Sequence, residues 1–244
     1  MRVLVAVKRV PDPSQRVRVN AEGTGIDPAG LRWVIDPYDE VALEQAIQWK
    51  EAGVATEIIA ASAGGQGCKD TLRSALALGA DRAVHFPASD DVAPLSVARA
   101  LADVARRESC DLIVVGAQAA DDGVTIGPLV AGVLDWPQAT RVTAATISGR
   151  VLSVQRVGDA GVEALDLDLP CVLTADLRLA TPRFAGLAAR LATKKAPIDE
   201  QPLAAAATAP RVVAMALVSR KREGHPVASA RELVAALRDR GALR

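Results

Sequence analysis

The chain has 244 residues, half of them hydrophobic, and its 29 basic residues balance 29 acidic ones. This length is enough for one sizeable core, and the balanced charge excludes a whole-molecule field that would attract nucleic acid or an acidic membrane surface. Apolar runs are shorter than the roughly 20 residues that a membrane helix requires, and the first ten residues lack a signal-peptide pattern. We therefore expect no membrane insertion, and a location in the cytoplasm or the mitochondrial matrix.

Residues that carry catalysis or metal chemistry are scarce. His85 and His225 are the two histidines, and no Ser/His/Asp or Cys/His arrangement accompanies them. The three cysteines are far apart and lack metal-ligand spacing, so we expect them to be buried. Three tryptophans, two phenylalanines and one tyrosine cannot build a stacking platform for single-stranded nucleic acid. The composition predicts no catalytic residues, no metal site and no nucleic-acid partner.

In the first 135 residues, apolar strands alternate with helices. Short β-branched runs indicate strands that are buried on both faces, at 3–7, 56–61, 83–86 and 112–115. Helical spacing of apolar residues indicates helices at 36–53, 68–78, 92–107 and around Leu129. This alternation predicts an α/β fold with a doubly wound, mostly parallel sheet and right-handed crossovers.

The first helix has the clearest start. Asp36 suits the N-cap, and Pro37 suits the first helical position. Asp39 and Glu40 follow, where acidic side chains favour the positive end of the helix dipole. Capping is therefore a sufficient explanation for the acidic residues at this helix start.

Other segments do not follow the strand–helix alternation. The alternation of valine and arginine at 16–19, with a turn at 22–25, predicts a hairpin before the first helix. After residue 136, strand signals without intervening helices favour an antiparallel edge or sheet extension, at 140–147, 151–157, 164–169 and 171–174. We expect a short strand at 212–217 and a last helix around Leu233 after a linker. The expected division is an α/β domain (1–180), a partner-recognition segment (181–200) and a C-terminal arm (201–244).

Three loops are expected at the carboxyl ends of the parallel strands, where ligands of doubly wound sheets bind. They are residues 8–13, the glycine-rich 62–67 and 116–127. Glycine lets a backbone approach a phosphate, but many strand-to-helix turns are glycine-rich merely to turn. Asp121 and Asp122 are compatible with a metal site or catalytic carboxylates, and also with a solvated loop, because adjacent side chains diverge.

A basic segment in the second half carries an apolar pair. Leu187 and Leu191 lie one helical turn apart, among the basic residues Arg183, Arg190, Lys194 and Lys195. Such a pair can anchor in a partner's pocket while the charges steer the encounter. The alternative is a surface helix whose leucines face the chain's own core.

Several separated segments resemble the β subunit of electron transfer flavoproteins. They are VLVAVKR at 3–9, IDPYDEVAL at 35–43, TLRSALALGAD at 71–81, GAQAADD at 116–122, LDWPQAT at 134–140 and RVGDAGVEALDLDLPCVLT at 156–174. The last is similar to the family's signature stretch. The order of the segments also agrees with that of the family along nearly the whole chain.

The resemblance implies a heterodimer with an adenine nucleotide α-hydrolase-like fold in this chain. An α subunit would carry the redox-active FAD, and this subunit would hold a structural AMP or, in electron-bifurcating members, a second FAD. Electrons would come from flavin dehydrogenases and pass to a membrane quinone oxidoreductase or another acceptor. The segment 201–244 would dock on the α subunit. Leu187 occupies the family's anchor position for the dehydrogenase, with Arg190, Leu191, Lys194 and Lys195 beside it.

The resemblance also implies the nucleotide contacts, residue by residue. They are Ala6, Asp36, Pro37, Tyr38, Asp39, Ala63, Asp121, Asp122, Gly123, Val124, Thr125, Ile126, Gly127 and Val130. Family members commonly have Asn at the position of Asp36, and the loop after Asp122 is one residue short here. Pro13 stands where well-studied members place an aromatic residue near the α-subunit flavin.

Two rival classes remain as alternatives. An adenine-nucleotide hydrolase or ligase would need a phosphate-activating loop such as S-G-G-x-D-S, and residues 62–67 lack its acidic member. A stand-alone nucleotide-binding sensor would have no need of an arm that docks elsewhere. We therefore expect an electron-transfer subunit rather than an enzyme.

Overall fold

The computed structural model describes the whole chain except residues 90–91, 121–122, 204–211, 219–223 and 244. The described residues divide into two units. The first comprises residues 1–17 and 28–212, and the second comprises residues 18–27 and 213–244. The first unit thus continues through 181–200, while residues 18–27 group with the C-terminal residues.

A nine-strand sheet forms the centre of the first unit, as far as its residues are described, in the order β11-β5-β4-β1-β6-β10-β7-β8-β9. The strands from β11 to β7 run parallel to their neighbours, and β7, β8 and β9 form an antiparallel extension. The strands are β1 (Arg2–Ala6), β4 (Glu57–Gly64), β5 (Arg82–Pro87), β6 (Leu112–Gly116), β7 (Gln138–Ser148), β8 (Val151–Gly158), β9 (Gly161–Asp168), β10 (Cys171–Ala175) and β11 (Asp199–Glu200). A separate antiparallel ribbon pairs β2 (Arg9–Pro11) with β3 (Trp33–Ile35).

Helices cover both faces of the parallel strands. One face packs against α1 (Pro37–Glu51) and α2 (Cys68–Leu78), and the other against α3 (Pro94–Arg107) and α4 (Ile126–Leu134). Successive residues of β1 enter opposite cores: Val3 and Val5 join the first, and Leu4 joins the second. Both cores therefore need an unbroken apolar strand, as the sequence pattern indicated. The predicted doubly wound, mostly parallel α/β fold is confirmed.

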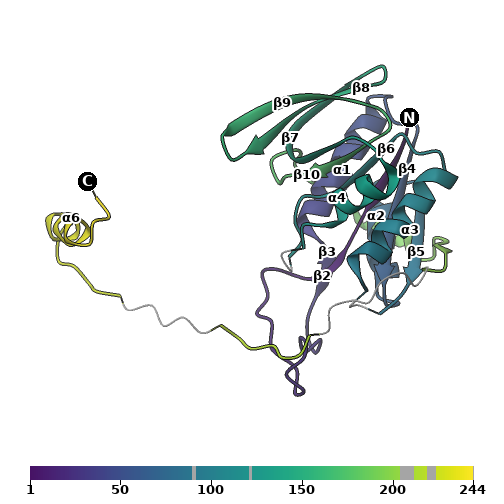
Figure 1. The fold of residues 1–244 in the computed structure, drawn as a ribbon. Helices are drawn as coiled ribbons and strands as arrows, with labels where there is room; N and C mark the ends of the chain where they lie inside the picture. The colour runs from purple at the N-terminus through teal and green to yellow at the C-terminus, as the bar shows by residue number, and fades with distance from the viewer. Residues whose placement is uncertain (90–91, 121–122, 204–211, 219–223, 244) are drawn as a thin grey trace. The chain divides into compact units, whose positions relative to one another are not determined.

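The strand predicted at 171–174 was wrongly grouped with the antiparallel extension. It is β10, which lies between β6 and β7 and runs parallel to both. All five of its residues are buried, so its continuous apolar run is that of a central parallel strand. The remaining three strands of the group form the expected extension, drawn in green in Figure 1.

Two shorter predictions have different outcomes. The hairpin expected at 16–26 forms as a short one, with an antiparallel bridge between Val19 and Ile26 and a hydrogen bond from Asn20 N to Gly25 O at 2.9 Å. No strand forms among the described residues 212–217, whose side chains are exposed. A segment with strand propensity does not form a β-strand unless it pairs with the edge of another strand.

The second unit contains the predicted last helix, α6 (Ala230–Asp239). The side chain of Ser229 accepts a hydrogen bond from Glu232 N at 3.2 Å, and Glu232 Oε2 accepts one from Ala228 N at 2.7 Å. The first bond caps the helix, and the second joins the Glu232 side chain to the residue before the N-cap, so both fix the helix start. Leu233 and Val234 remain exposed within this unit.

Candidate nucleotide site at the carboxyl edge of the sheet

The three predicted loops follow the neighbouring strands β1, β4 and β6, which run parallel, so they leave the sheet at the same edge. Ala6 ends β1 opposite Ala61, and Ala63 lies near the end of β4 opposite Phe86. Ala6 and Ala63 are both half-buried. The structure thus places these two predicted contacts on adjacent strands at the ligand-binding edge of the fold.

The start of α1 joins two of these loops. The Asp39 carboxylate accepts hydrogen bonds from Lys8 N at 2.7 Å and Gly116 N at 2.8 Å. Asp36 accepts one from Tyr38 N at 2.9 Å, as an N-cap should, and one from Ala120 N at 2.7 Å. The acidic pair therefore organises the backbone after β1 and β6, beyond the capping role that the sequence explained.

Both carboxylates are buried, and burial changes their ionisation. It raises the pKa of Asp39 to about 7, and the nearby charge of Asp36 adds to this, while the amides of Lys8 and Gly116 act in the opposite direction. Burial likewise raises the pKa of Asp36, against the amide hydrogen bonds from Ala120 and Tyr38. Two buried carboxylates at one helix start make this edge sensitive to pH.

Two glycines allow close packing around the site. A Cβ on Gly116 would lie 2.7 Å from Tyr38 Cβ and 3.1 Å from Asp39 N, so the backbone of Gly116 packs directly against the start of α1. A Cβ on Gly127 would lie 2.3 Å from Thr174 Cγ2, which places the first turn of α4 directly against β10. Side chains at these positions would move the loop between them.

The loop before α4 is open to solvent. Gly123, Val124 and Thr125 are exposed, and Thr125 is the N-cap without a side-chain capping bond. Ile126 is half-buried, while Gly127 and Val130 are buried beneath the helix start. Among the predicted contacts, Asp121 and Asp122 lie outside the described residues, and Pro37 and Tyr38 are half-buried beside Asp36.

Sequence reasoning missed one cation at this edge. The guanidinium of Arg9 stacks 3.9 Å from the centre of the Trp33 ring, and it lies against Gly67 at the start of α2. No ion pair among the described residues uses this guanidinium. The pairing of β2 with β3, which was not predicted, is what brings Arg9 and Trp33 together.

The predicted partner segment lies elsewhere in the first unit, on α5 (Leu187–Thr193). Leu187 is 75% exposed and Leu191 is 62% exposed, so neither faces the core. Arg190, Lys194 and Lys195 are exposed as well. The alternative of a surface helix with inward leucines is therefore wrong.

Metal and membrane features are absent from the part of the chain that the structure describes. No group of three potential metal ligands comes together in it. Its helices are too short or too polar to cross a bilayer.

Comparison with known proteins decides the family. Residues 24–206 match the family model described as the electron transfer flavoprotein domain. The human electron transfer flavoprotein subunit beta is 45% identical over 204 residues, which are 82% of this chain and 80% of the human protein. The mitochondrial subunit beta from Oryza sativa subsp. indica is 44% identical over 192 residues, 77% of this chain and 76% of its own length. The chain belongs to the electron transfer flavoprotein β-subunit family.

The electron transfer flavoprotein family model covers the partner segment and the part of the candidate nucleotide site that follows residue 24. A further relative, the mitochondrial subunit beta of Arabidopsis thaliana, is 42% identical over 203 residues, 82% of this chain and 81% of its own length. The matched range 24–206 contains the start of α1, the start of α4 and Leu187. The resemblance found in the sequence is thereby confirmed.

Proposed function

We propose that this chain is the β subunit of a heterodimeric electron transfer flavoprotein. With an α subunit, it accepts electrons from flavin dehydrogenases and passes them to a quinone reductase or another acceptor. The observation that carries this proposal is the 45% identity to a protein of that name across 82% of the chain. The location that fits this role is the bacterial cytoplasm or the mitochondrial matrix.

The carboxyl edge of the sheet is the proposed site of AMP. Gly116 and Gly127 let β6 and α4 pack closely against their neighbours at this edge, and Thr125 leaves the start of α4 uncapped by a side chain. The exposed amides of this helix start are suited to the phosphate. The amide-bonded carboxylate of Asp36 is not, because like charges repel. We therefore place the phosphate towards Thr125 and the adenosine towards Ala6, Tyr38 and Ala63.

In this role the chain needs no catalytic residue of its own. His85 is fully buried, and its Nε2 lies 3.0 Å from the carbonyl oxygen of Gly64, so it supports the glycine loop rather than facing solvent. The redox chemistry belongs to FAD, held mainly by the α subunit. This chain contributes a structural nucleotide and the surface around Leu187, where we place the dehydrogenase contact with Arg190, Leu191, Lys194 and Lys195.

Co-expression with a flavoprotein α subunit from the same genome tests the proposal. We expect a yellow 1:1 complex whose flavin is reduced by a flavin dehydrogenase and reoxidised by a quinone-linked acceptor. A colourless chain that does not bind the α subunit and that turns over ATP would instead indicate an adenine-nucleotide enzyme.

A further inference from the structure

The segment that carries the exposed leucines begins at a forked ion pair. We call residues 184–198 the leucine segment. Directly before it, Arg183 Nε lies 2.8 Å from Glu44 Oε2, and its Nη1 lies 2.5 Å from Glu51 Oε1. Its Nη2 lies 2.9 Å from an oxygen of each carboxylate. One guanidinium therefore holds two carboxylates that are two turns apart on α1.

The fork is strongest at its buried member. Only 5% of the Glu44 side chain is exposed. Burial acts to raise the pKa of Glu44, but hydrogen bonds from Arg183 and Gln48 outweigh it, so the pKa lies below its ordinary value. The Arg183 backbone N–H adds a third bond, at 3.2 Å to Glu44 Oε2. The main chain and the side chain of Arg183 are thus both fixed to α1, which orients the chain as it enters the leucine segment.

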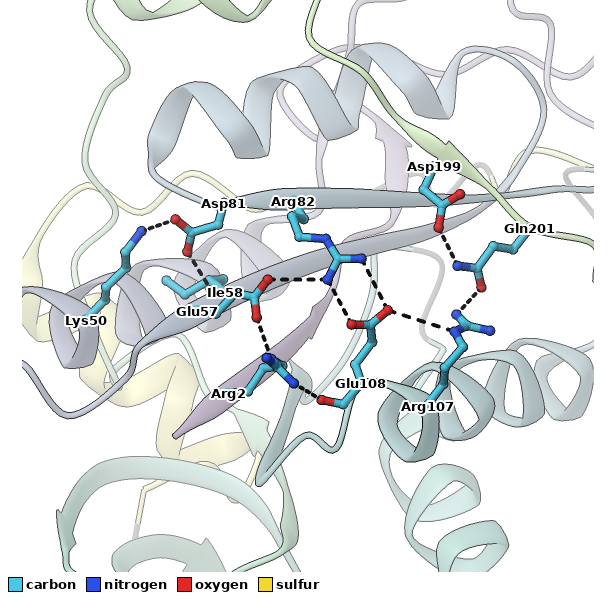
Figure 2. Close-up of polar contacts among 10 residues, drawn as sticks. All are labelled: Arg2, Lys50, Glu57, Ile58, Asp81, Arg82, Arg107, Glu108, Asp199 and Gln201. Atoms are coloured by element: carbon cyan, nitrogen blue, oxygen red, sulfur yellow. Dashed lines mark hydrogen bonds and ion pairs between the residues drawn. The ribbon is translucent and has the colours of Figure 1, made fainter.

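The segment ends in a second set of polar contacts, beside β5 and α3. After Ile198 the chain forms β11, which pairs with β5, and Gln201 N donates to His85 O at 2.9 Å. Figure 2 shows Gln201 between Asp199 and Arg107, with Arg107 beside Glu108 and the network running on to Arg82. The exit of the segment is therefore tied to α3 and β5.

Between these two sets of polar contacts, the side chains of the leucine segment are exposed or half-buried. Its helix α5 has seven residues and no buried side chain, and helices this short are marginal without tertiary contacts. A hollow of about 440 Å³ lies beneath it, lined in part by Leu76, Ala80, Thr193 and Ile198. The helix packs on α2 without burying a side chain, so the polar contacts at both ends of the segment also help to set its position.

We propose that Arg183 is a positioning residue for partner docking, which presents Leu187 and Leu191 in a preformed arrangement by fixing the entry of the leucine segment to α1. This inference rests on the proposed contact of Leu187 with a dehydrogenase. Loss of the fork lets the segment sample other positions, so each encounter succeeds less often. Electron transfer inside a complex that has formed is not affected, because Arg183 is not at the apolar contact.

A double-mutant cycle on the α–β complex tests the proposal, with the flavin dehydrogenase that reduces the wild-type complex as probe. We expect Arg183→Ala to raise KM for the complex about tenfold with kcat within about twofold of wild type. In a Leu187→Ala background the same change should have little further effect, since the residue it positions is gone. Amide exchange at Arg190 and Lys194 should quicken in Arg183→Ala.

Three further variants control the experiment. Arg178→Ala is the matched control, because Arg178 pairs only with Asp176, two residues earlier, among the described residues, and it should leave KM unchanged. Should Arg183→Ala fail to assemble, Glu51→Gln removes only the exposed half of the fork, and Arg183→Lys keeps one charge without the fork. Both should raise KM by a smaller factor.

The outcomes separate this inference from the proposed function. Additive effects of Arg183→Ala and Leu187→Ala, or an unchanged KM in the Arg183 and Glu51 variants, would overturn the positioning role and leave the partner contact standing. An unchanged KM in Leu187→Ala would mean that the partner contact itself is wrong, and the positioning role with it.

Discussion

Two carboxylates at the start of α1 accept hydrogen bonds from backbone amides of the neighbouring loops. Asp39 receives the amides of Lys8 and Gly116, and Asp36 receives those of Tyr38 and Ala120. Each oxygen has one N–H partner, which is how buried carboxylates are usually satisfied. These side chains therefore hold the loops of the candidate site in place.

Their burial has a consequence for stability against pH. The pKa of Asp39 is about 7 in the folded chain, above its ordinary value of 3.8, because of burial and of the neighbouring Asp36 charge. The folded chain thus keeps a proton that the unfolded chain releases, so stability contributed here falls as pH rises from about 4 to about 7. Asp36→Asn should lower the pKa of Asp39. The loss of stability with rising pH should then be smaller, and it should be complete at a lower pH.

Urea unfolding from pH 4 to pH 8 checks this prediction. Asn is as good an N-cap as Asp, so α1 should persist in the variant. Asp103→Asn, at an exposed aspartate of α3, is the control and should reproduce the wild-type profile. If the wild type and Asp36→Asn lose stability over the same pH range by the same amount, the coupling between the two carboxylates is refuted.

At the residue scale, sequence reasoning succeeded where one residue has a local role. Asp36 and Pro37 start the helix as predicted, because capping depends on neighbours in the chain. The contact of Arg9 with Trp33 and Gly67 was not predictable, since it depends on a ribbon between residues 22 positions or more apart. Long-range pairing of this kind leaves no periodic signal.

At the scale of single elements, α4 depends on one glycine for its position. Gly127→Ala would place a methyl group 2.3 Å from Thr174 Cγ2, and β10 behind Thr174 is fully buried and cannot give way. We expect a loss of about 1–3 kcal/mol in the free energy of unfolding, with weaker retention of the nucleotide. Chemical denaturation and the AMP content after extensive dialysis measure the two effects.

Gly132→Ala in the same helix is the matched control. A Cβ at Gly132 meets no atom within 4 Å, so alanine there should add about 0.5–1 kcal/mol of stability through helix propensity. Equal effects of the two substitutions would mean that contact with β10 does not set the position of α4.

The ends of helices and strands were predictable where glycine or proline residues terminate them. The helix predicted at 68–78 is α2 with the same ends, set by the glycine loop before it and Gly79 after it. The strand at 171–174 was assigned to the wrong part of the sheet because strand order is a property of the whole fold. Its continuous burial pattern was the available signal for a central strand.

At the scale of the whole molecule, the two units make different contributions to the proposed heterodimer. The first unit contains the candidate nucleotide site and the leucine segment. The second contains α6, with Leu233 46% exposed and Val234 39% exposed. An amphipathic helix with exposed leucine and valine is typical of a segment that another chain covers.

Removal of residues 213–244 should therefore separate folding from assembly. The shortened chain should keep the far-UV circular dichroism of the sheet and a melting temperature within a few degrees of the full chain, since the first unit holds both cores. Capture by an immobilised α subunit should fall strongly. In the full chain, Leu233→Ala with Val234→Ala should weaken capture, and Arg238→Ala should not. Full capture by the shortened chain would place the α-subunit contact elsewhere.

The central claim, an electron transfer flavoprotein β subunit with its own nucleotide, is tested most directly by the nucleotide content of the purified α–β complex. After denaturation, the supernatant is separated by chromatography and each nucleotide is counted per heterodimer. The account predicts one FAD, from the α subunit, and one AMP, from this chain. Two FAD and no AMP would assign the second flavin to this site, and FAD alone, with neither AMP nor a second FAD, would contradict the account.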